Sequence, residues 1–321
     1  MGKNRNNPTL SILLRIVFVI LVAGFCILSV YSNSGTASGA DETPAPEAAA
    51  LPTPTASAEP TPSPTPSPEP EYFTITMIGD CTLASAQSQK ALDYSYENMV
   101  GDDYTYPFAK TLDYFDDDDL TFTNLECALT ESTDAANKAF LFKCSPEYAN
   151  ILKAGSVEFV TLGNNHVLDY GEQGYADTKA ALDAAGIGYA GRDEWTLYTT
   201  KNGLKIGVYA ISFGKVPQIE AGIAALKDAG AEFIIAALHW GDEGSYTVND
   251  MQIRQGHAAI DAGADVVYGS HPHTLQKCEE YNGKYIYYSM GNWSFGGNTN
   301  PRDKDTVIVK LTVMRDVDGT V

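Results

Sequence analysis

A proline-rich segment near the N-terminus limits which part of the chain can form a folded domain. Ten prolines fall between Pro44 and Pro70, in a Pro-Thr-Pro-Ser pattern with almost no large apolar residues. Such a composition cannot bury a hydrophobic core and is typical of an extended spacer. We therefore expect residues 34–71 to form a disordered linker, and residues 72–321 to form one large α/β domain.

The segment before this linker has the features of a membrane anchor. Residues 11–31 are apolar apart from Arg15, and a helix of that length spans ~31 Å, about one bilayer core. Basic residues lie before or within its start and acidic residues follow it, so the positive-inside rule places the large domain outside the cytoplasm. We interpret residues 1–33 as a cytoplasmic tail with an uncleaved single-pass anchor in the cell membrane. A cleaved signal peptide is the alternative, because Ser38-Gly39-Ala40 resembles a cleavage site.

The charge of the chain excludes some classes of partner. Its net charge is −20 at pH 7, and such a surface repels nucleic acid and anionic lipid. We therefore expect no nucleic-acid partner. A polyanionic polymer is repelled as well unless bound cations offset the charge locally, which a metal site would do.

Four cysteines fall within the expected domain. Outside the cytoplasm they could form disulfides, for which three pairings exist; the alternative is four buried thiols in a core that does not need them. The residues are Cys81, Cys127, Cys144 and Cys278.

From residue 72 the sequence alternates β-rich runs with alanine-rich amphipathic stretches, which predicts an α/β fold. The expected strands are 72–78, 120–123, 159–162, 205–211, 233–238, 264–268, 285–289 and 306–313. The expected helices are 107–115, 146–154, 175–185, 219–229 and 251–262. Asn202-Gly203 and Asn282-Gly283 are typical of type I′ turns, and the hairpins that they would close predict mixed sheets.

Polar side chains with metal-binding chemistry follow most of the expected core strands. Each of them alone is more often a turn residue or a helix cap. However, four of the five histidines lie at strand ends, where ligands collect in α/β sheets. Carboxylate, carboxamide and imidazole groups together suit manganese, iron or zinc. We expect one or two such divalent ions, which would activate water and neutralise an anionic transition state.

These motifs, in this order, resemble the capsule and poly-gamma-glutamate biosynthesis protein CapA family. The resemblance runs from about Thr74 to Phe295. It rests on Gly79-Asp80, Asn124-Leu125-Glu126, Asn164-Asn165-His166-Val167-Leu168-Asp169-Tyr170-Gly171, His239-Trp240-Gly241, His271-Pro272-His273 and Tyr288-Ser289-Met290-Gly291-Asn292. That family is similar to the calcineurin-like metallophosphatases, so the resemblance implies a four-layer αββα sandwich of two mixed sheets.

The resemblance also implies roles for individual residues. His166 would protonate the leaving group or stabilise the transition state, with Asp169 orienting it. The residues expected to bind substrate are Lys143, Asn124 and Asn292. The expected metal ligands are Asp80, Glu126, Asn165, His239, His271 and His273. Metallophosphatases carry Asp-x-His where this chain reads Asp80-Cys81-Thr82, so one metal position would have fewer ligands than the other.

Two functions compete for this set of residues. The first is a metal-dependent hydrolase that cleaves a phosphoester or an amide in a cell-envelope substrate, and His166 with Asp169 favours it. The second is a non-catalytic, metal-containing subunit that binds polymer in a capsule-synthesis complex, which the incomplete first motif favours. We expect the hydrolase. The expected partners are an anionic cell-envelope polymer or its precursor, capsule-synthesis subunits in the membrane, and the membrane itself.

Overall fold

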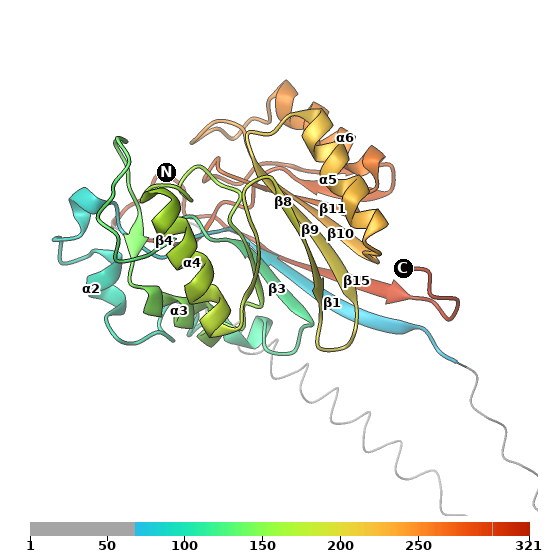
Figure 1. The fold of residues 1–321 in the computed structure, drawn as a ribbon, viewed down its shortest axis with the longest axis horizontal. Helices are drawn as coiled ribbons and strands as arrows, with labels where there is room; N and C mark the ends of the chain where they lie inside the picture. The colour runs from blue at the N-terminus through green and yellow to red at the C-terminus, as the bar shows by residue number, and fades with distance from the viewer. Residues whose placement is uncertain (1–67, 297) are drawn as a thin grey trace, which may run out of the picture. The chain divides into compact units, whose positions relative to one another are not determined.

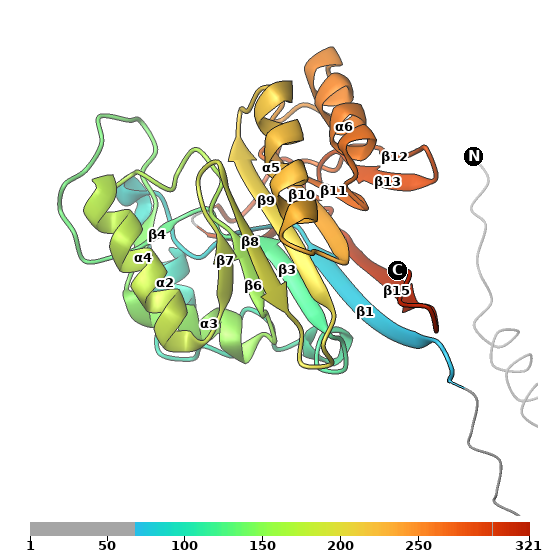
Figure 2. The same cartoon turned by 45° about the vertical axis from the view of Figure 1, so that its right-hand side comes forward.

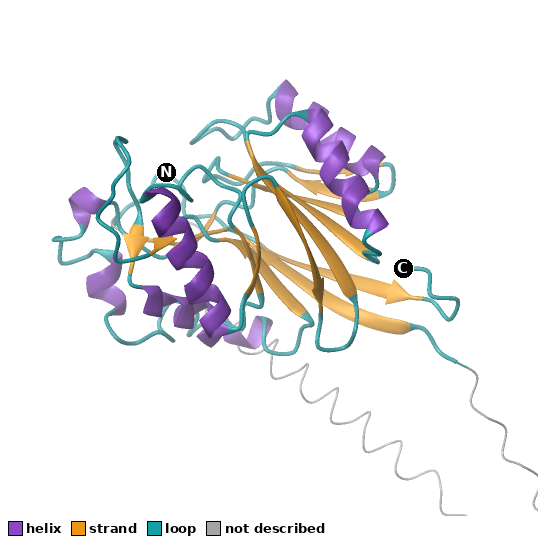
Figure 3. Ribbon diagram, viewed as in Figure 1, coloured by secondary structure: helices purple, strands orange, loops and turns teal. Residues whose placement is uncertain are grey.

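The computed structural model describes residues 68–296 and 298–321. The expected anchor and nearly all of the expected linker lie outside these residues. Among the described helices, none is both long and apolar enough to cross a membrane. The described residues form a mixed α/β structure with two main sheets, as predicted (Figures 1 and 3).

The first sheet has five strands in the order β15-β1-β3-β6-β7. Four of them run parallel to one another, and β15 is antiparallel to β1. The parallel strands therefore end at one edge, so that the residues that follow them meet there. The strands are β15 (Ile308–Arg315), β1 (Glu71–Ile78), β3 (Leu120–Asn124), β6 (Phe159–Thr161) and β7 (Gly188–Ala190).

The second sheet has six strands in the order β12-β13-β11-β10-β9-β8. Its four inner strands are parallel, and a hairpin adds an antiparallel strand at each edge. The second sheet is thus mixed, as the Asn-Gly pairs predict, whereas the first is mixed through the antiparallel β1–β15 pair. The strands are β12 (Cys278–Tyr281), β13 (Lys284–Tyr287), β11 (Val266–Ser270), β10 (Phe233–His239), β9 (Lys205–Ser212) and β8 (Glu194–Thr199).

The two hairpin turns differ from each other. Asn282 and Gly283 both have positive φ, 51° and 74°, which a type I′ turn requires, so this prediction is confirmed. In the other hairpin, Gly203 has a φ of 87° but Asn202 is not at positive φ. The N–H of Gly203 donates to Thr200 O (3.0 Å), so the loop is one residue longer than a type I′ hairpin loop. The type I′ prediction is therefore wrong for this hairpin.

Apolar residues from both sheets form the core between them. Ile75 and Phe122 of the first sheet and Ile206 and Ile235 of the second belong to one buried cluster. The outer faces are covered by helices, α3 (Ala149–Ala154) and α4 (Gly171–Ala185) on the first sheet, and α5 (Val216–Asp228) and α6 (Asp250–Ala262) on the second (Figure 2). Because strand side chains alternate between faces, each sheet can be buried on both sides.

One predicted helix is wrong. Residues 107–115 form turns and a short 3₁₀ segment, η2 (Leu112–Tyr114), instead of an α-helix. Phe108 and Phe115 in this segment are both buried and pack edge to face, with ring centroids 6.1 Å apart. The two buried rings fix the path of the segment by tertiary packing, which local periodicity does not reveal.

Several short elements complete the structure around the edge of the sheets. They are too short for sequence periodicity to detect. The helices are η1 (Gln87–Gln89), α2 (Tyr96–Val100) and η3 (Pro146–Tyr148), which leads into α3, and the paired strands are β2 (Asp80–Thr82) with β14 (Asn292–Phe295), and β4 (Ala128–Leu129) with β5 (Lys143–Cys144).

All four cysteines of the domain are free thiols. Cys81, Cys127 and Cys144 are buried, whereas Cys278 is exposed on β12. The alternative of buried thiols therefore holds for three of the four positions.

Candidate metal centre

The predicted site residues meet where the strands of both sheets end. Asp80 lies two residues after the end of β1, Asn124 ends β3, and His239 ends β10. His271 follows β11, and Asn292 opens β14 beside Asp80, its partner in the β2–β14 pair. The parallel strands bring these positions to one edge, and the packing of the sheets against each other brings the two edges together.

Two buried carboxylates form the floor of the site. Asp80 and Glu126 are each 1% exposed. The Nδ2 of Asn124 donates to Asp80 Oδ1 (3.0 Å) and to Glu126 Oε2 (3.2 Å). The Nδ2 of Asn164 in turn donates to Asn124 Oδ1 (3.0 Å). The Asn124 side chain is therefore engaged by protein groups and holds the two acids at a fixed separation.

His239 lies over these acids from the second sheet. Its Nε2 is 3.5 Å from Glu126 Oε1 and 2.9 Å from Asn165 Oδ1. On the other side of the ring, Nδ1 hydrogen-bonds to Ser270 Oγ (2.9 Å). A polar partner behind a ligand ring is the usual way in which proteins orient a metal-binding histidine. Sequence reasoning missed Ser270, although its place directly before the His-Pro-His segment was a usable signal.

The loop with His271 and His273 has an unusual backbone. Both residues have positive φ, 96° and 56°, a region that costs a non-glycine residue roughly 1–3 kcal/mol and concentrates at functional sites. His273 Nδ1 is 3.3 Å from Asp80 Oδ2 and donates to Asn292 Oδ1 (2.9 Å). The N–H of His271 points to Asp80 Oδ2 (3.4 Å). The strained loop thus directs both residues toward the acids.

The residues present fit a divalent metal ion. One ligand atom each of Glu126, His271 and His273 lie within 4.8 Å of one another. Within the described part of the chain, Glu126 Oε1 and His271 Nδ1 are buried and have no hydrogen-bond partner. Leaving such groups unpaired is costly, and a cation among them would satisfy both.

Burial and neighbouring charges shift the protonation of these groups. Burial raises the pKa of Glu126, and the cationic form of His273 only partly opposes it. Burial and the neighbouring histidines lower the pKa of His239 and of His271. Burial also disfavours charge on His273, but Glu126 and Asp80 outweigh it and raise the pKa of His273 to about 10. His239 and His271 are therefore neutral near pH 7, the state in which imidazole binds a metal.

A histidine–aspartate pair lies beside this cluster. His166 Nδ1 donates to Asp169 Oδ2 (2.7 Å), and Asp169 is fully buried. The same carboxylate accepts from Phe142 N (2.8 Å) and from Lys138 Nζ (2.6 Å). Asp169 thereby fixes the orientation of the imidazole, and His166 Nε2 is left to exchange a proton.

Sequence reasoning chose Lys143 as the basic residue of the site and missed Lys138. The Nζ of Lys143 donates to Ser132 O (2.6 Å) and lies 4.8 Å from the centre of the Tyr170 ring. Lys138, by contrast, contacts Asp169 and Asn165 O (2.8 Å). Lys138 lies within the irregular segment 130–141 and Lys143 follows it at the start of β5, and the sequence of this segment has no periodicity that would distinguish them. Substrate binding by Lys143 stays a prediction.

Thr82 occupies the position where the metallophosphatase motif Asp-x-His has histidine, and Cys81 is the residue directly before it. Burial raises the pKa of its thiol to about 12, and hydrogen bonding to Thr123 only partly opposes this. A thiol ligates metal as the thiolate, so Cys81 does not replace the missing ligand.

The sequence is similar to proteins of capsule synthesis. Residues 74–296 match the family described as bacterial capsule synthesis protein PGA_cap. The chain is 33% identical over 196 residues to the PGA biosynthesis protein CapA of Bacillus subtilis (strain 168). The aligned region covers 54% of this chain and 52% of that protein. The chain is 26% identical over 271 residues to the capsule biosynthesis protein CapA of Bacillus anthracis, covering 74% of this chain and 63% of that protein. The matched region thus spans less than two thirds of each relative.

Two solved structures are also similar in fold. TT1561 of Thermus thermophilus has a TM-score of 0.44 at 9% identity, over 70% of this chain and 91% of that one. The calcineurin-like phosphoesterase YfkN from Bacillus subtilis has a TM-score of 0.38 at 14% identity, over 78% and 92%. These TM-scores are too low to carry an argument about activity.

Proposed function

The chain belongs to the bacterial capsule synthesis protein family PGA_cap, and on that premise we propose that it is a metal-dependent hydrolase with a metallophosphatase-type fold. The substrate is an anionic cell-envelope polymer or its precursor, cleaved at a phosphoester or an amide. One observation carries the proposal: Glu126 Oε1 and His271 Nδ1 are buried without a hydrogen-bond partner among the described residues, and both residues belong to a cluster with ligand spacing.

Glu126, His271 and His273 would hold manganese, iron or zinc, with Asp80, Asn165 and His239 beside them. When bound, such an ion polarises a phosphoryl or carbonyl oxygen and lowers the pKa of water. The ion also offsets the negative charge of the protein where an anionic substrate must approach. Because Thr82 offers no imidazole and Cys81 supplies no thiolate, the ligands support one well-held ion better than two.

His166 would act on the leaving group. Its Nδ1 proton is held by Asp169, so a second proton at Nε2 is the one that can be delivered. Lys138 and the Phe142 N–H hold the Asp169 carboxylate in place. The pair therefore stabilises the charged imidazole that a general acid needs before it gives up its proton.

The experiment that tests this function compares metal content with turnover. The full chain, His271→Ala and the matched control His257→Ala, whose ring contacts Glu279 outside the site, are purified and analysed by elemental mass spectrometry. We expect about one transition-metal ion per chain, lost in His271→Ala and kept in the control. Aryl phosphoesters and gamma-glutamyl amides are then screened for turnover that follows the metal. A metal-free wild-type chain after incubation with manganese, iron and zinc would contradict the proposal.

The incomplete Asp80-Cys81-Thr82 motif favours a second candidate, a metal-containing subunit that binds polymer without cleaving it. This candidate requires metal-dependent polymer binding that survives His166→Ala but not His271→Ala. A metal-loaded chain that retains polymer but turns over no substrate would favour it over the hydrolase.

We also propose that residues 1–33 anchor the chain in the cell membrane by a single pass, with residues 72–321 outside the cytoplasm near capsule-synthesis subunits. The apolar run and the basic residues at its start support this orientation. Protease added to intact cells should digest the domain, and protection of the domain until the cells are lysed would contradict the orientation.

A further inference from the structure

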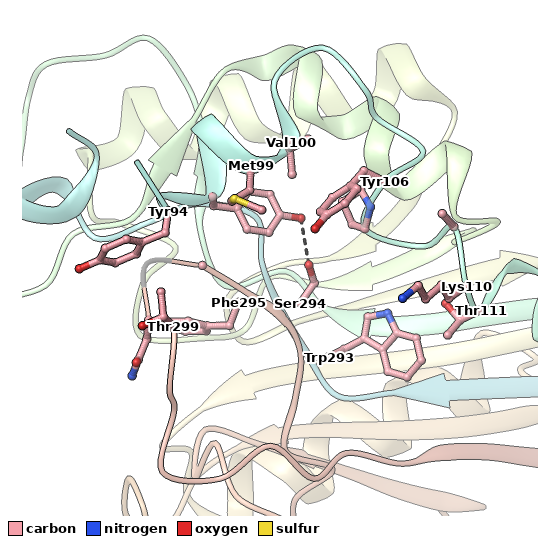
Figure 4. Close-up of a pocket in the computed structure, with 15 residues that line it drawn as sticks. Tyr94, Met99, Val100, Tyr106, Lys110, Thr111, Trp293, Ser294, Phe295 and Thr299 are labelled. Carbon is pink, nitrogen blue, oxygen red and sulfur yellow. Dashed lines mark hydrogen bonds between the residues drawn. The ribbon is translucent and has the colours of Figure 1, made fainter. Parts of the chain in front are cut away.

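Two hollows lie beside the metal centre and contact different residues of it. The first, here called the Arg192 pocket, has a volume of about 300 Å³, and Asn165, Arg192 and Phe213 are among the residues that line it. The second, here called the Lys110 cavity, has a volume of about 590 Å³ and lies between the segment 94–111 and strand β14 (Figure 4). Both volumes are large enough for one or more units of a polymer.

The Arg192 pocket adjoins the ligand residues of the second sheet. The Oδ1 of Asn165, which lines the pocket, lies 2.9 Å from His239 Nε2. Phe213 follows β9 directly, and its ring packs edge to face on His271, with centroids 4.9 Å apart. Phe213 is 55% exposed and has a φ of 48°, which is rare for a bulky residue and concentrates at functional sites. A chain held in this pocket would therefore pass His239 and His271.

The Lys110 cavity adjoins the metal centre at another residue. The Phe295 ring, which lines the cavity, is 5.7 Å from the His273 ring. Figure 4 shows Tyr94 and Phe295 toward one end of the cavity, and Trp293 with Lys110 toward the other. A chain that leaves the metal centre past Phe295 would therefore run along this cavity toward Lys110.

Each hollow has one basic side chain, in a protein whose net charge is −20. Among the described residues that line the Lys110 cavity, Lys110 is the one charged side chain. Arg192 contacts Glu172 (3.0 Å), whose side chain is 74% exposed, so this pair contributes little and the guanidinium can take another carboxylate. Asp193 also lines the Arg192 pocket, but its oxygens already accept hydrogen bonds from other side chains. Both hollows therefore favour a ligand with carboxylates.

Exposed rings accompany the basic group of the Lys110 cavity. Tyr94 is 43% exposed, Tyr106 is 51% and Phe295 is 39%. Large apolar groups gathered around a concavity mark a binding site more often than scattered ones do. Trp293 packs against Phe115, with ring centroids 5.5 Å apart, so this wall of the cavity is formed before a ligand arrives. Such a surface suits a ligand with methylene groups between its charges.

A continuous series of ring contacts joins the two hollows across the ligand residues. The centroids are 4.9 Å apart from Phe213 to His271, 6.0 Å from His271 to His273, and 5.7 Å from His273 to Phe295. One unit of an extended gamma-glutamyl chain spans about 6 Å, as standard bond lengths give. A chain of a few such units is therefore long enough to enter both hollows at once.

We propose that an anionic, amide-linked chain lies across the metal centre with units in both hollows, and that the protein cleaves it internally; the inference rests on the proposed function. A gamma-glutamyl chain has this chemistry, with methylene groups for the rings and a carboxylate on each unit for Arg192 and Lys110. Water adds its hydroxyl to the carbonyl carbon and its proton to the nitrogen, so the C–N bond breaks without a further reactant. Removal of single end units would require a hollow on one side of that bond only.

Calorimetry tests the path of the chain without turnover. The protein is the full chain with His166→Ala, in the presence of manganese. The probes are a gamma-glutamyl hexamer, the corresponding trimer, and a neutral hexamer in which each free carboxylate is an amide. We expect the acidic hexamer to bind about tenfold more tightly than the trimer, because it fills both hollows. The neutral hexamer should bind about tenfold more weakly than the acidic one.

Two substitutions assign the two hollows. Arg192→Gln and Lys110→Gln should each weaken binding of the acidic hexamer about fivefold, and their effects should multiply, since the two residues line different hollows. The matched controls are Arg254→Gln and Lys153→Gln, which change exposed basic residues that line neither hollow. Circular dichroism verifies that each variant is folded.

Product lengths show where the chain is cut. The unsubstituted protein is incubated with manganese and end-labelled poly-gamma-glutamate, and the products are separated by size. We expect the mean length to fall early, while little free glutamate appears. Stepwise release of single units from one end would overturn internal cleavage.

The path of the chain and the hydrolase are judged separately. An acidic hexamer that binds no more tightly than the trimer, or that either substitution fails to weaken, would overturn the path through both hollows. Binding in both hollows without turnover by the unsubstituted protein would keep the path and reject the hydrolase together with internal cleavage. Turnover of an aryl phosphoester without binding of the acidic hexamer would keep the hydrolase and reject the path.

Discussion

Two buried carboxylates of the site, Asp169 and Glu126, are treated very differently by their surroundings. Asp169 accepts hydrogen bonds from Lys138 Nζ, Phe142 N and His166 Nδ1. Glu126 accepts one on Oε2 from Asn124, while its Oε1 has no hydrogen-bond partner among the described residues and has only His239 Nε2 (3.5 Å) and His273 Nε2 (3.8 Å) within ion-pair distance. Both side chains are almost completely buried, so the difference lies in their partners.

The comparison separates a carboxylate that protein groups satisfy fully from one that they do not. Around Asp169 the protein alone satisfies the carboxylate, and that region can orient His166 with or without an ion. Around Glu126 a buried charge is left short of partners, which typically costs about 1–3 kcal/mol. We infer that the fold tolerates this cost because the missing partner is a cation.

The largest effect is expected for Asp169→Asn. The amide keeps the shape of the side chain but cannot stabilise a protonated His166, so kcat should fall about 1,000-fold. Metal content should stay unchanged, because Asp169 lies outside the ligand cluster. Steady-state kinetics and elemental analysis measure the two quantities, with the exposed Asp183→Asn as a control. A variant with full activity would show that His166 needs no orientation.

Glu126→Gln should act on metal binding, which Asp169→Asn leaves unchanged. Metal affinity should fall about 100-fold, whereas the free energy of unfolding in EDTA should equal or exceed that of the wild type, since the cost of burying the carboxylate exceeds its attraction to His273. Burial raises the pKa of Glu126 above its ordinary 4.5, so the wild type loses stability as the pH rises above that value. The advantage of the variant should therefore be absent near pH 4 and grow at higher pH. Urea titrations in EDTA at several pH values test this, and a less stable variant at neutral pH would break the comparison.

Lys138→Gln is expected to have a smaller effect, about a tenfold loss of kcat, because Asp169 keeps its two other donors. Lys143→Gln is the informative partner, since the sequence pointed to Lys143 and the structure places Lys138 on Asp169. Initial rates of both variants are compared with those of the exposed Lys153→Gln. If kcat falls in Lys143→Gln but not in Lys138→Gln, Lys143 is the basic residue of the site, as predicted from the sequence.

A half-buried acid, Glu158, sharpens the comparison from outside the site. It accepts from Thr121 N (2.7 Å) and Ser156 Oγ (3.3 Å), yet burial raises its pKa from 4.5 to about 7. A raised pKa in the folded state means that stability falls as the pH rises from about 4.5 to about 7. Glu158→Gln should add about 1 kcal/mol near pH 8 and nothing near pH 4, because a weaker hydrogen bond to Thr121 offsets part of the gain. Thermal unfolding at the two pH values measures this, and a pH-independent effect would contradict it.

The parts of the site at the ends of long strands could be predicted from sequence. Buried β-rich runs locate parallel strands, and parallel strands end together, so Asp80, His239 and His271 follow from pattern alone. The choice between Lys138 and Lys143 depends on how an irregular segment folds over Asp169, which no local pattern encodes. The same holds for residues 107–115, which periodicity predicts to be helical, and for β14, which is too short to detect.

The pairing of β1 with β15 has a consequence for how the protein is made. Residues 71–78 bond to residues 308–315, and Asp80 is paired with Asn292 in the short β2–β14 ladder. Asp80 and Glu126 are synthesised early. They cannot be held in their final positions until the distant strands β14 and β15 have left the ribosome. Contacts so far apart in sequence form slowly. Ion capture is therefore expected at the end of folding, so that a chain cut short before β14 would be recognisable by its inability to retain the ion.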